Sequence, residues 1–515
     1  MFRLTKNNIR LQYSGFIIFT VQVFSVITGL IFTLLLTRNM STAQYGIWTN
    51  IFDYTAYFQL FSGIIPFWAV RFMARDKEGT VKTSAYAQLT IALVSMTTYF
   101  PLIVLITRAI GTSSYLPIYI IAGFSILSTY MIGVFESVLQ SSKPQGVGYG
   151  LMIEEIVKVS VAAVFIIGFG QLFLGAILGL VVSCYVQIFY YVYLLYPEFK
   201  QKANWAHLKE WLKGSAAIAY SAVGTQLMSF VLILLFLYGG SDTRAYYQAA
   251  FSFTIIIGYS LSLAFALYPK LLAKTCSDEQ VGVSFRTVLM LAIPFATITM
   301  AMSASFLTVL NVSYAVAWPV LIALSVDTLI VLISTFYSSC LMGAEHFDAE
   351  GKISIRHLVR SKIFKVFTVP YIQAAIALPL TYLVLTRLHV AGSVQATLYV
   401  IAILIGVHTS ALIGLYMFMH RSVRIPVAWK SIAKYILAAL LMGAVLILLP
   451  TTTTLLSTIA KALAGFLIYV GLLLAIDVQA RKLIRLIWEE IKGSIRLLRS
   501  KGNNSENNGL GTSQN

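Results

Sequence analysis

Charged side chains are scarce in this sequence. They make up 11% of the 515 residues, whereas 58% are hydrophobic. A soluble domain carries roughly 25% charged residues, so this composition excludes an ordinary soluble protein. The three cysteines, Cys184, Cys276 and Cys340, are odd in number and lie in apolar runs or in basic loops. This placement argues against a disulfide framework, and we expect reduced thiols with a packing role.

Motifs for catalysis and metal binding are missing as well. The sequence contains no G-x-x-x-x-G-K-[ST] phosphate-binding loop. It also contains no His/Cys cluster with the spacing of metal ligands. We therefore expect no catalytic residues, no bound metal and no cofactor, and we do not expect an enzyme.

Long apolar runs are abundant. A helix that spans a bilayer needs about 20 largely apolar residues, and most stretches between turn signals reach that length. We expect fourteen spans, over residues 14–37, 45–70, 85–107, 115–139, 151–170, 172–196, 214–238, 245–268, 285–310, 314–342, 363–386, 394–419, 431–450 and 455–477. The first run is longer than the ~7–15-residue core of a signal peptide, so we expect a membrane anchor there.

The basic residues predict the orientation. With the N-terminus inside, 31 of the 37 Lys and Arg residues lie on the inner side, and only Arg38, Arg108, Arg244 and Arg387 lie in outer loops. Lys and Arg collect in the cytoplasmic loops of membrane proteins. The bias predicts a multi-pass protein of the cell membrane with both termini in the cytoplasm. It also explains the net charge of +18 through contacts with anionic lipids, without nucleic acid.

An internal repeat relates two parts of the chain. Ser41-Thr42-Ala43-Gln44-Tyr45-Gly46 opens the second span, and Ser241-Asp242-Thr243-Arg244-Ala245-Tyr246-Tyr247 opens the eighth. The exits of these spans, 71–75 and 270–274, are also about 200 residues apart. Transporters often contain two related halves with the substrate site between them.

The fold class follows from the spans and the repeat. We predict an all-α polytopic membrane protein with about 14 transmembrane helices, arranged as two six-helix bundles plus two C-terminal helices. The predicted parts are an N-terminal bundle over 1–200, a C-terminal bundle over 201–425, two additional helices over 426–480, and a basic amphipathic cytoplasmic helix with a disordered tail over 481–515.

Local motifs resemble one family of transporters. Residues 36–46 (LTRNMSTAQYG) follow the family's "R-x-L-x-x-x-x-Y-G" exit from helix one. Residues 242–250 (DTRAYYQAA) resemble its "vG-x-Y-x-x-A" entry to helix eight, and Tyr268-Pro269-Lys270 resembles the proline that closes that helix. The chain thus resembles the Wzx-type lipid-linked oligosaccharide flippases, the polysaccharide-export branch of the multidrug/oligosaccharidyl-lipid/polysaccharide (MOP) superfamily. One departure is Arg244-Ala245, where the family has glycine.

The resemblance implies transport. Such proteins move an undecaprenyl- or dolichol-linked sugar across the membrane while two halves rock around a central cleft lined by helices one, two, seven and eight. The implied role is the inner-to-outer flipping of a polyprenyl-(pyro)phosphate-linked oligosaccharide for cell-surface polysaccharide or glycoprotein biosynthesis. The expected partners are this lipid-linked glycan, membrane lipids, H⁺ or Na⁺, and glycan-assembly enzymes.

Five basic residues are candidates for binding the diphosphate. Arg71 and Arg75 share a helical face, as do Lys270 and Lys274, and the repeat would bring the two pairs together at the inner mouth of the cleft. A diphosphate accepts several hydrogen bonds from Arg and Lys. Anchoring to lipid head groups is the alternative for these pairs. Arg38, at the outer end of the first span, would either meet the diphosphate or brace the outer gate.

Two intramembrane carboxylates are candidates for ion coupling. Ionisable residues within spans are rare and often functional. Asp53 lies roughly 12 Å and Asp327 roughly 20 Å along their helices, at ~1.5 Å per residue. Carboxylates at this depth must be paired, hydrated or protonated, which suits H⁺ or Na⁺ binding or a structural hydrogen bond. Glu154 and Lys158, four residues apart, are expected to form a local ion pair.

Two other functions compete with the flippase. A membrane glycosyltransferase or polymerase would need carboxylates or metal ligands on a large outer loop, but the expected outer loops are short and hold one acid, Asp242. A cation-coupled, MATE-like multidrug exporter shares the fold. It would favour acidic and aromatic surfaces, so the basic pairs favour the flippase.

Overall fold

The structure is a computed structural model that describes residues 21, 24–74, 77–264, 277–343, 362–387, 392–420, 428–477 and 481. Within these residues the chain is helical, without strands. The helices are Phe24–Asn39, α2 (Thr42–Phe58), α3 (Ile64–Ala74), α4 (Thr80–Ala109), η1 (Ser113–Tyr115), α5 (Leu116–Ser142), α6 (Pro144–Ala163), the π-helix η2 (Val164–Gly168), α7 (Leu172–Phe199), α8 (Trp205–Gly214), α9 (Ala216–Gly239), α10 (Ser241–Gly258), η3 (Tyr259–Ala264), α12 (Asp278–Ala301), α13 (Ser303–Leu310), η4 (Val312–Ala317), α14 (Trp318–Gly343), α16 (Lys362–Arg387), α17 (Ser393–His420), α18 (Trp429–Leu448) and α19 (Leu455–Ile476).

Ten of the described helices are long and apolar enough to cross a membrane. The other four predicted spans correspond to helices that are short, broken or charged: Phe24–Asn39, α2 with α3, α6, and α10 with η3. α6, for example, carries Glu154, Glu155 and Lys158. The prediction of an all-α polytopic membrane protein is confirmed.

Local chemistry decides where the predicted spans break. The second span is interrupted between Phe58 and Ile64, and Pro66 lies in the first turn of α3, where a missing N–H costs nothing. Gly170, with φ of +66°, lies in the turn between α6 and α7. The prediction of one helix over 285–310 is wrong, because α12 ends at Ala301 and α13 is a separate helix.

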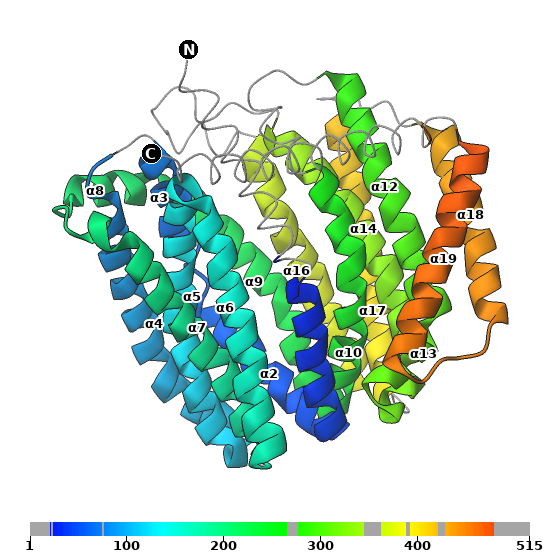
Figure 1. Cartoon of the computed structure of the whole chain (residues 1–515), viewed down its shortest axis with the longest axis horizontal. Helices are drawn as coiled ribbons and strands as arrows, with labels where there is room; N and C mark the ends of the chain where they lie inside the picture. The colour runs from blue at the N-terminus through cyan, green and yellow to red at the C-terminus, as the bar shows by residue number, and fades with distance from the viewer. Residues whose placement is uncertain are drawn as a thin grey trace, which may run out of the picture.

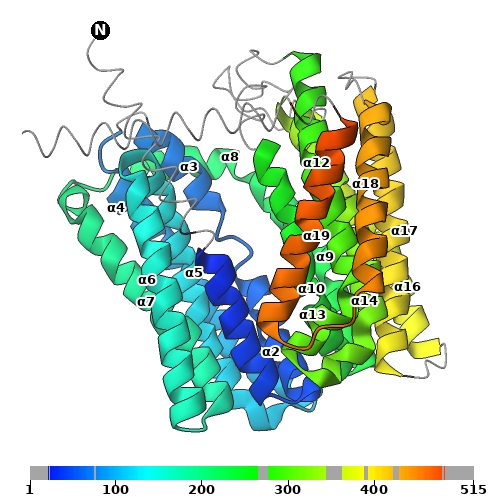
Figure 2. The same ribbon diagram turned by 45° about the vertical axis from the view of Figure 1, so that its right-hand side comes forward.

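The helices form two groups that lie side by side (Figures 1 and 2). In one group α4 packs on α5, and both α5 and α6 pack on α7. In the other, α9 packs on α16, α14 on α17, and α12 on α18, which in turn packs on α19. The groups meet mainly along α2 and α10. The residue boundaries of the predicted bundles stay a prediction.

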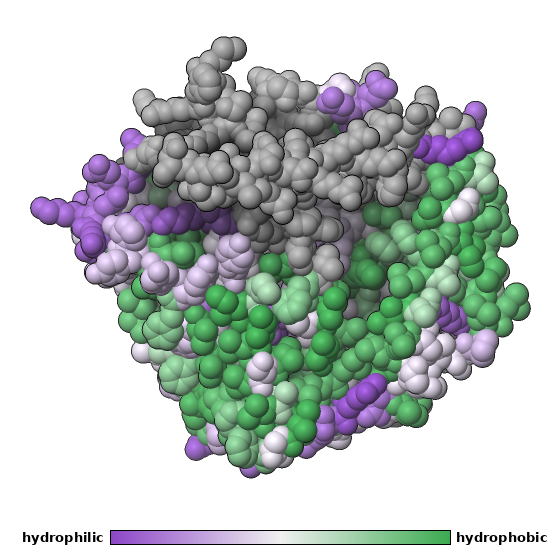
Figure 3. Space-filling view, viewed as in Figure 1, coloured by the Kyte–Doolittle hydropathy of each residue, from purple (hydrophilic) through white to green (hydrophobic). Residues whose placement is uncertain are grey.

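The outer surface suits a bilayer. Figure 3 shows apolar side chains in a broad band, with polar side chains gathered toward its two rims. Phe189 and Leu456 are 71% and 80% exposed, which would be costly in water and is favourable in lipid. We call the end of the molecule that carries α3 and α8 the α8 face, and the opposite end, which carries α13, the α13 face (Figure 1).

Candidate functional site

A cavity of about 1010 Å³ lies between the two helix groups. Its lining includes the four spans that the family resemblance predicted, present here as Phe24–Asn39, α2, α9 and α10 with η3. α12, α13 and α19 also contribute, which the sequence did not predict. The second of the two C-terminal helices is therefore part of the cavity wall.

The cavity has two chemically different parts. One part is polar, with Asp53 and Arg244 beside Gln226 and Gln248. The other part is an apolar wall to which α12 and α19 contribute Phe295, Ile298, Ile459, Leu463 and Phe466. A site of this kind fits a molecule with a polar head and an apolar chain.

The polar part is built around a buried ion pair. Arg244 Nε donates to Asp53 Oδ2 at 2.7 Å, and Arg244 Nη2 donates to Asp53 Oδ1 at 2.9 Å. The side chains are only 4% and 10% exposed. Arg244 Nη1 also donates to Gln248 Oε1 at 3.1 Å. Among the described lining residues these two are the only charged ones, so this part of the cavity is electrically neutral.

Sequence reasoning identified Asp53 but missed its partner. Asp53 was predicted as an ion-coupling group, and in the structure both of its oxygens accept hydrogen bonds from Arg244. Arg244 was counted with the outer loops, although it lies in the first turn of α10. The available signal was its position where the family has glycine, because a large charged side chain at such a position indicates a specific partner.

The two groups are closed against each other at the α13 face. Arg38 Nη2 donates to the carbonyl oxygen of Val309, in the last turn of α13, at 3.1 Å. Asn311 Nδ2 donates to the carbonyl oxygen of Thr37 at 3.2 Å. A cation is favourable at the carboxyl end of a helix, so Arg38 has the geometry of the predicted gate brace. Its predicted contact with a diphosphate stays a prediction.

Helices α2 and α10 are in close contact at a glycine. A Cβ atom on Gly46 would lie 1.9 Å from the carbonyl oxygen of Ser241. Nearby, the hydroxyl of Thr42 donates to the carboxylate of Asp242. Ser41 caps the start of α2, and Ser241 is the first residue of α10. The equivalent positions of the predicted repeat thus pack against each other.

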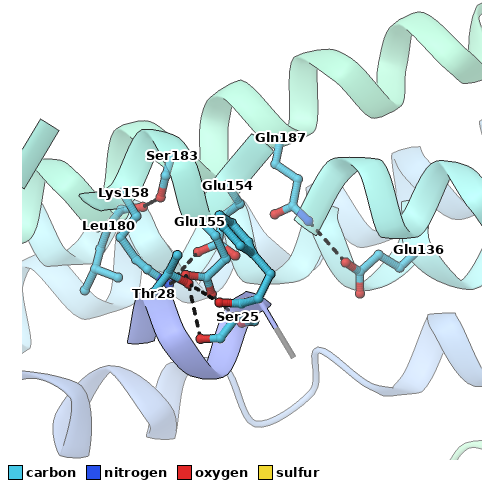
Figure 4. A network of polar contacts seen from close by, with 10 residues as sticks. Ser25, Thr28, Glu136, Glu154, Glu155, Lys158, Leu180, Ser183 and Gln187 are labelled. Carbon is cyan, nitrogen blue, oxygen red and sulfur yellow. Dashed lines mark hydrogen bonds and ion pairs between the residues drawn. The ribbon is translucent and has the colours of Figure 1, made fainter. Parts of the chain in front are cut away.

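A second polar network ties the first helix to α6 (Figure 4). Glu155 accepts a hydrogen bond from Ser25 Oγ and another from Thr28 Oγ1, both at 2.6 Å. Lys158 Nζ lies 2.8 Å from Glu155 Oε2 and 3.4 Å from Glu154 Oε1. The predicted pair of Glu154 and Lys158 is present, but Lys158 lies closer to Glu155. Ser25 also lines the cavity, so this network fixes one cavity wall from behind.

The second ion-coupling candidate pairs with a histidine. Asp327 on α14 lies 2.8 Å, through Oδ1, from Nδ1 of His408 on α17. Both side chains are largely buried, at 9% and 15% exposed. Sequence reasoning assigned no role to His408, although a single histidine within an apolar span was an available signal. The described cavity lining does not include this pair.

The four inner basic candidates are only partly described. Arg71 lies on α3, where its Nη1 donates to the carbonyl oxygen of Phe67 at 2.9 Å and its guanidinium lies 3.5 Å from the Phe67 ring centroid. Arg75, Lys270 and Lys274 lie outside the described residues. The predicted approach of the two pairs therefore stays a prediction.

Cavity, helix number and helix arrangement define a polytopic transporter-like fold. A family model described as "Polysaccharide biosynthesis protein" matches residues 12–275, half of the chain. The chain belongs to this family. No curated protein matches it.

Solved structures share the fold. The lipid II flippase MurJ, in an inward closed conformation, is 15% identical and covers 90% of this chain and 99% of its own, with a TM-score of 0.63. An inward-facing multidrug resistance MATE transporter of the MOP superfamily is 13% identical over 77% of this chain and 95% of its own, with a TM-score of 0.59.

A third structure is a MOP superfamily transporter from Pyrococcus furiosus Vc1, 15% identical, with coverage of 81% and 95% and a TM-score of 0.51. At these identities the likeness concerns the fold alone. Family and fold together agree with the resemblance drawn from the sequence: the protein is a multi-pass membrane protein of the polysaccharide biosynthesis family, and its fold is the one seen in MurJ and the MATE transporter.

Proposed function

We propose that this protein flips a polyprenyl-(pyro)phosphate-linked oligosaccharide from the inner to the outer leaflet by alternating access. The observation that carries this proposal is the cavity, which combines a polar part with an apolar wall. A lipid-linked sugar has the same two parts. The family, described by polysaccharide biosynthesis, agrees with a glycan cargo.

The substrate fits the cavity in one orientation. Gln226 and Gln248 offer amide groups for sugar hydroxyls, and Arg244 offers a guanidinium for the phosphate. The polyprenyl chain lies against the apolar side chains of α12 and α19, such as Phe295 and Leu463.

The distribution of Lys and Arg residues between the two ends of the molecule supports an assignment of the cytoplasmic side. Lys77, Lys82, Lys143 and Lys200 lie in or beside the connections that the sequence placed inside, whereas Arg108 ends α4 at the opposite end. We therefore take the α8 face as cytoplasmic, in line with the predicted cytoplasmic termini of a cell-membrane protein. The closed α13 face is then the outer side.

The pair of Asp327 and His408 is the proposed coupling site. An imidazole nitrogen can accept a proton and is a poor ligand for Na⁺ compared with oxygen. We therefore favour H⁺ over Na⁺ as the coupling ion at this pair. Glycan-assembly enzymes remain the expected partners that deliver the substrate.

A MATE-like cation exporter is the second candidate, supported by the shared fold. A cationic drug would need an acid in the cavity, and Asp53 is the one carboxylate among the described lining residues. Arg244 already neutralises it. The cavity lining thus offers a cation no unpaired carboxylate among the described residues.

Flipping is tested in proteoliposomes that contain a fluorescent polyprenyl-diphosphate sugar, with an impermeant quencher added outside. We expect protein-dependent loss of the protected fluorescent fraction, and no loss with a non-phosphorylated analogue. Reversing the charges of Arg71, Arg75, Lys270 and Lys274 to Glu is expected to abolish flipping while membrane insertion persists. Transport of a cationic drug, without transport of the lipid, would favour the exporter instead.

A further inference from the structure

We propose that Arg244 is the phosphate-binding group of the cavity and that Asp53 is its resident anion, which a substrate phosphate displaces. The displacement breaks the ion pair between α2 and α10 and so releases the outer side for opening. This inference rests on the proposed lipid-phosphate substrate. It adds the residue that binds the phosphate and the ion pair through which binding changes the conformation.

The geometry of the pair matches that of a phosphate complex. Two nitrogen atoms of Arg244 donate in parallel to the two oxygens of Asp53, at 2.7 and 2.9 Å. A guanidinium binds two oxygens of a phosphate through the same fork. A phosphate can therefore replace Asp53 without any change in the position of Arg244. The two anions compete for one set of donors.

The surroundings of Arg244 add further ligands. Gln248 lies one helical turn along α10 and already accepts from Arg244 Nη1, and its amide nitrogen can donate to the same phosphate. The guanidinium carbon lies 5.7 Å from the centroid of the Tyr247 ring, which favours a cation at this place. Arg244 thus stays ordered when its anion changes.

The pair lies next to the contact between Gly46 and Ser241, which we call the outer seal. Arg244 comes three residues after Ser241, and Asp53 comes seven residues after Gly46, which is two turns along one face of α2. The backbone of Ser241 leaves no room for a side chain at Gly46. Loss of the ion pair therefore removes the charged contact that holds α2 against α10 next to this point.

The displaced carboxylate needs new partners, because an unpaired charge in a dry interior is costly. Opening at the α13 face brings water to Asp53, and a proton is the other way to remove its charge. The closed state is thus favoured with Asp53 on Arg244, and the open state is favoured with a phosphate on Arg244. The competition couples binding to the direction of movement.

The test measures the distance between two spin labels at the α13 face, in protein whose three cysteines are replaced by Ser. The labels replace Ser114, within η1 in one group, and Val312, which begins η4 in the other. Both positions are exposed. Geranylgeranyl diphosphate is the probe, and geranylgeraniol is the control without phosphate.

We expect the diphosphate to lengthen this distance in the wild-type protein and the alcohol to leave it unchanged. Asp53→Asn should lengthen it without any ligand and bind the diphosphate more tightly. The double variant Asp53→Asn/Arg244→Gln, which leaves no unpaired charge, should also open but no longer respond to diphosphate. Arg244→Lys should weaken diphosphate binding about tenfold or more, because one charged hydrogen bond is lost.

A matched control is Asp477→Asn, which removes another acid from an ion pair, with Lys434, outside the cavity. It should change neither the distance nor the affinity. If both Asp53 variants stay closed, or if the double variant Asp53→Asn/Arg244→Gln keeps full diphosphate affinity, the resident-anion proposal is overturned. If the wild-type protein binds no diphosphate while the ligand-free Asp53 variants still open, the substrate proposal fails and the ion pair survives only as a latch.

Discussion

The close contact of Gly46 with the backbone of Ser241 makes a sharp prediction for Gly46→Ala. The added methyl group would lie 1.9 Å from the carbonyl oxygen of Ser241 and 2.6 Å from its carbonyl carbon. Both atoms belong to the backbone of α10 and cannot turn away as a flexible side chain could. Since ordinary contact begins near ~3.5 Å, α2 and α10 must separate by about 1.5 Å at this point.

The cost falls on the closed state alone. Overpacking of a well-packed contact typically costs about 1–3 kcal/mol. A state in which the two groups have separated at the α13 face does not contain this clash. Gly46→Ala should therefore shift the population toward outward opening by about 5- to 150-fold, the range that corresponds to this free energy.

The assay is the spin-label distance between positions 114 and 312, recorded without ligand. We expect a longer mean distance or a second, longer population for Gly46→Ala. Gly29→Ala is the matched control: Gly29 also lies on a cavity-lining helix, and its added Cβ atom would meet nothing within 4 Å. A Gly46→Ala distance distribution identical to that of Gly29→Ala would refute the assignment of this contact as the outer seal.

Three further predictions concern the other polar contacts. Arg38→Ala removes a charged hydrogen bond to α13, which solvent screening at this exposed residue limits to about 1 kcal/mol, so the same spin-label pair should report slightly more opening than in an Arg38→Lys control. Glu155→Gln should lower the thermal unfolding temperature in detergent more than Glu154→Gln, because Glu155 holds Lys158 and also the first helix; equal losses would contradict this. His408→Gln keeps a polar group beside Asp327 but cannot carry a proton, so transport in proteoliposomes should lose its dependence on a pH gradient, and an unchanged dependence would rule out proton coupling at this pair.

The spans could be predicted from sequence because their cause is local. Each helix needs only enough apolar residues to cross the hydrocarbon layer, and the turns carry their own signals, such as Gly170 with its positive φ. The break before α13 was not foreseen. Residues 303–310 are as apolar as a membrane span, and only the packing of Leu307 and Leu310 in the core makes them a separate short helix.

The site was harder to predict because its contacts join distant residues. Asp53 and Arg244 are 191 residues apart, and Asp327 and His408 are 81 apart. A single sequence can identify an acid that needs a partner inside the membrane, but it does not say which base turns toward it. The Tyr-Gly pair of the family motif was visible, yet the reason for Gly46 is the backbone of Ser241 on another helix.

A neutral ion pair inside the cavity avoids the energetic cost that an unpaired basic side chain would have there. An unpaired Arg244 in this buried position would be costly whenever no substrate is bound. A permanently paired Arg244 could not bind a phosphate. An exchangeable partner resolves the conflict, because Asp53 stabilises the guanidinium in the empty closed state and yields to an anion with more charge and the same geometry. The basic side chains predicted at the inner mouth would then concentrate the lipid phosphate, while Arg244, deeper in the cavity, would convert its arrival into movement.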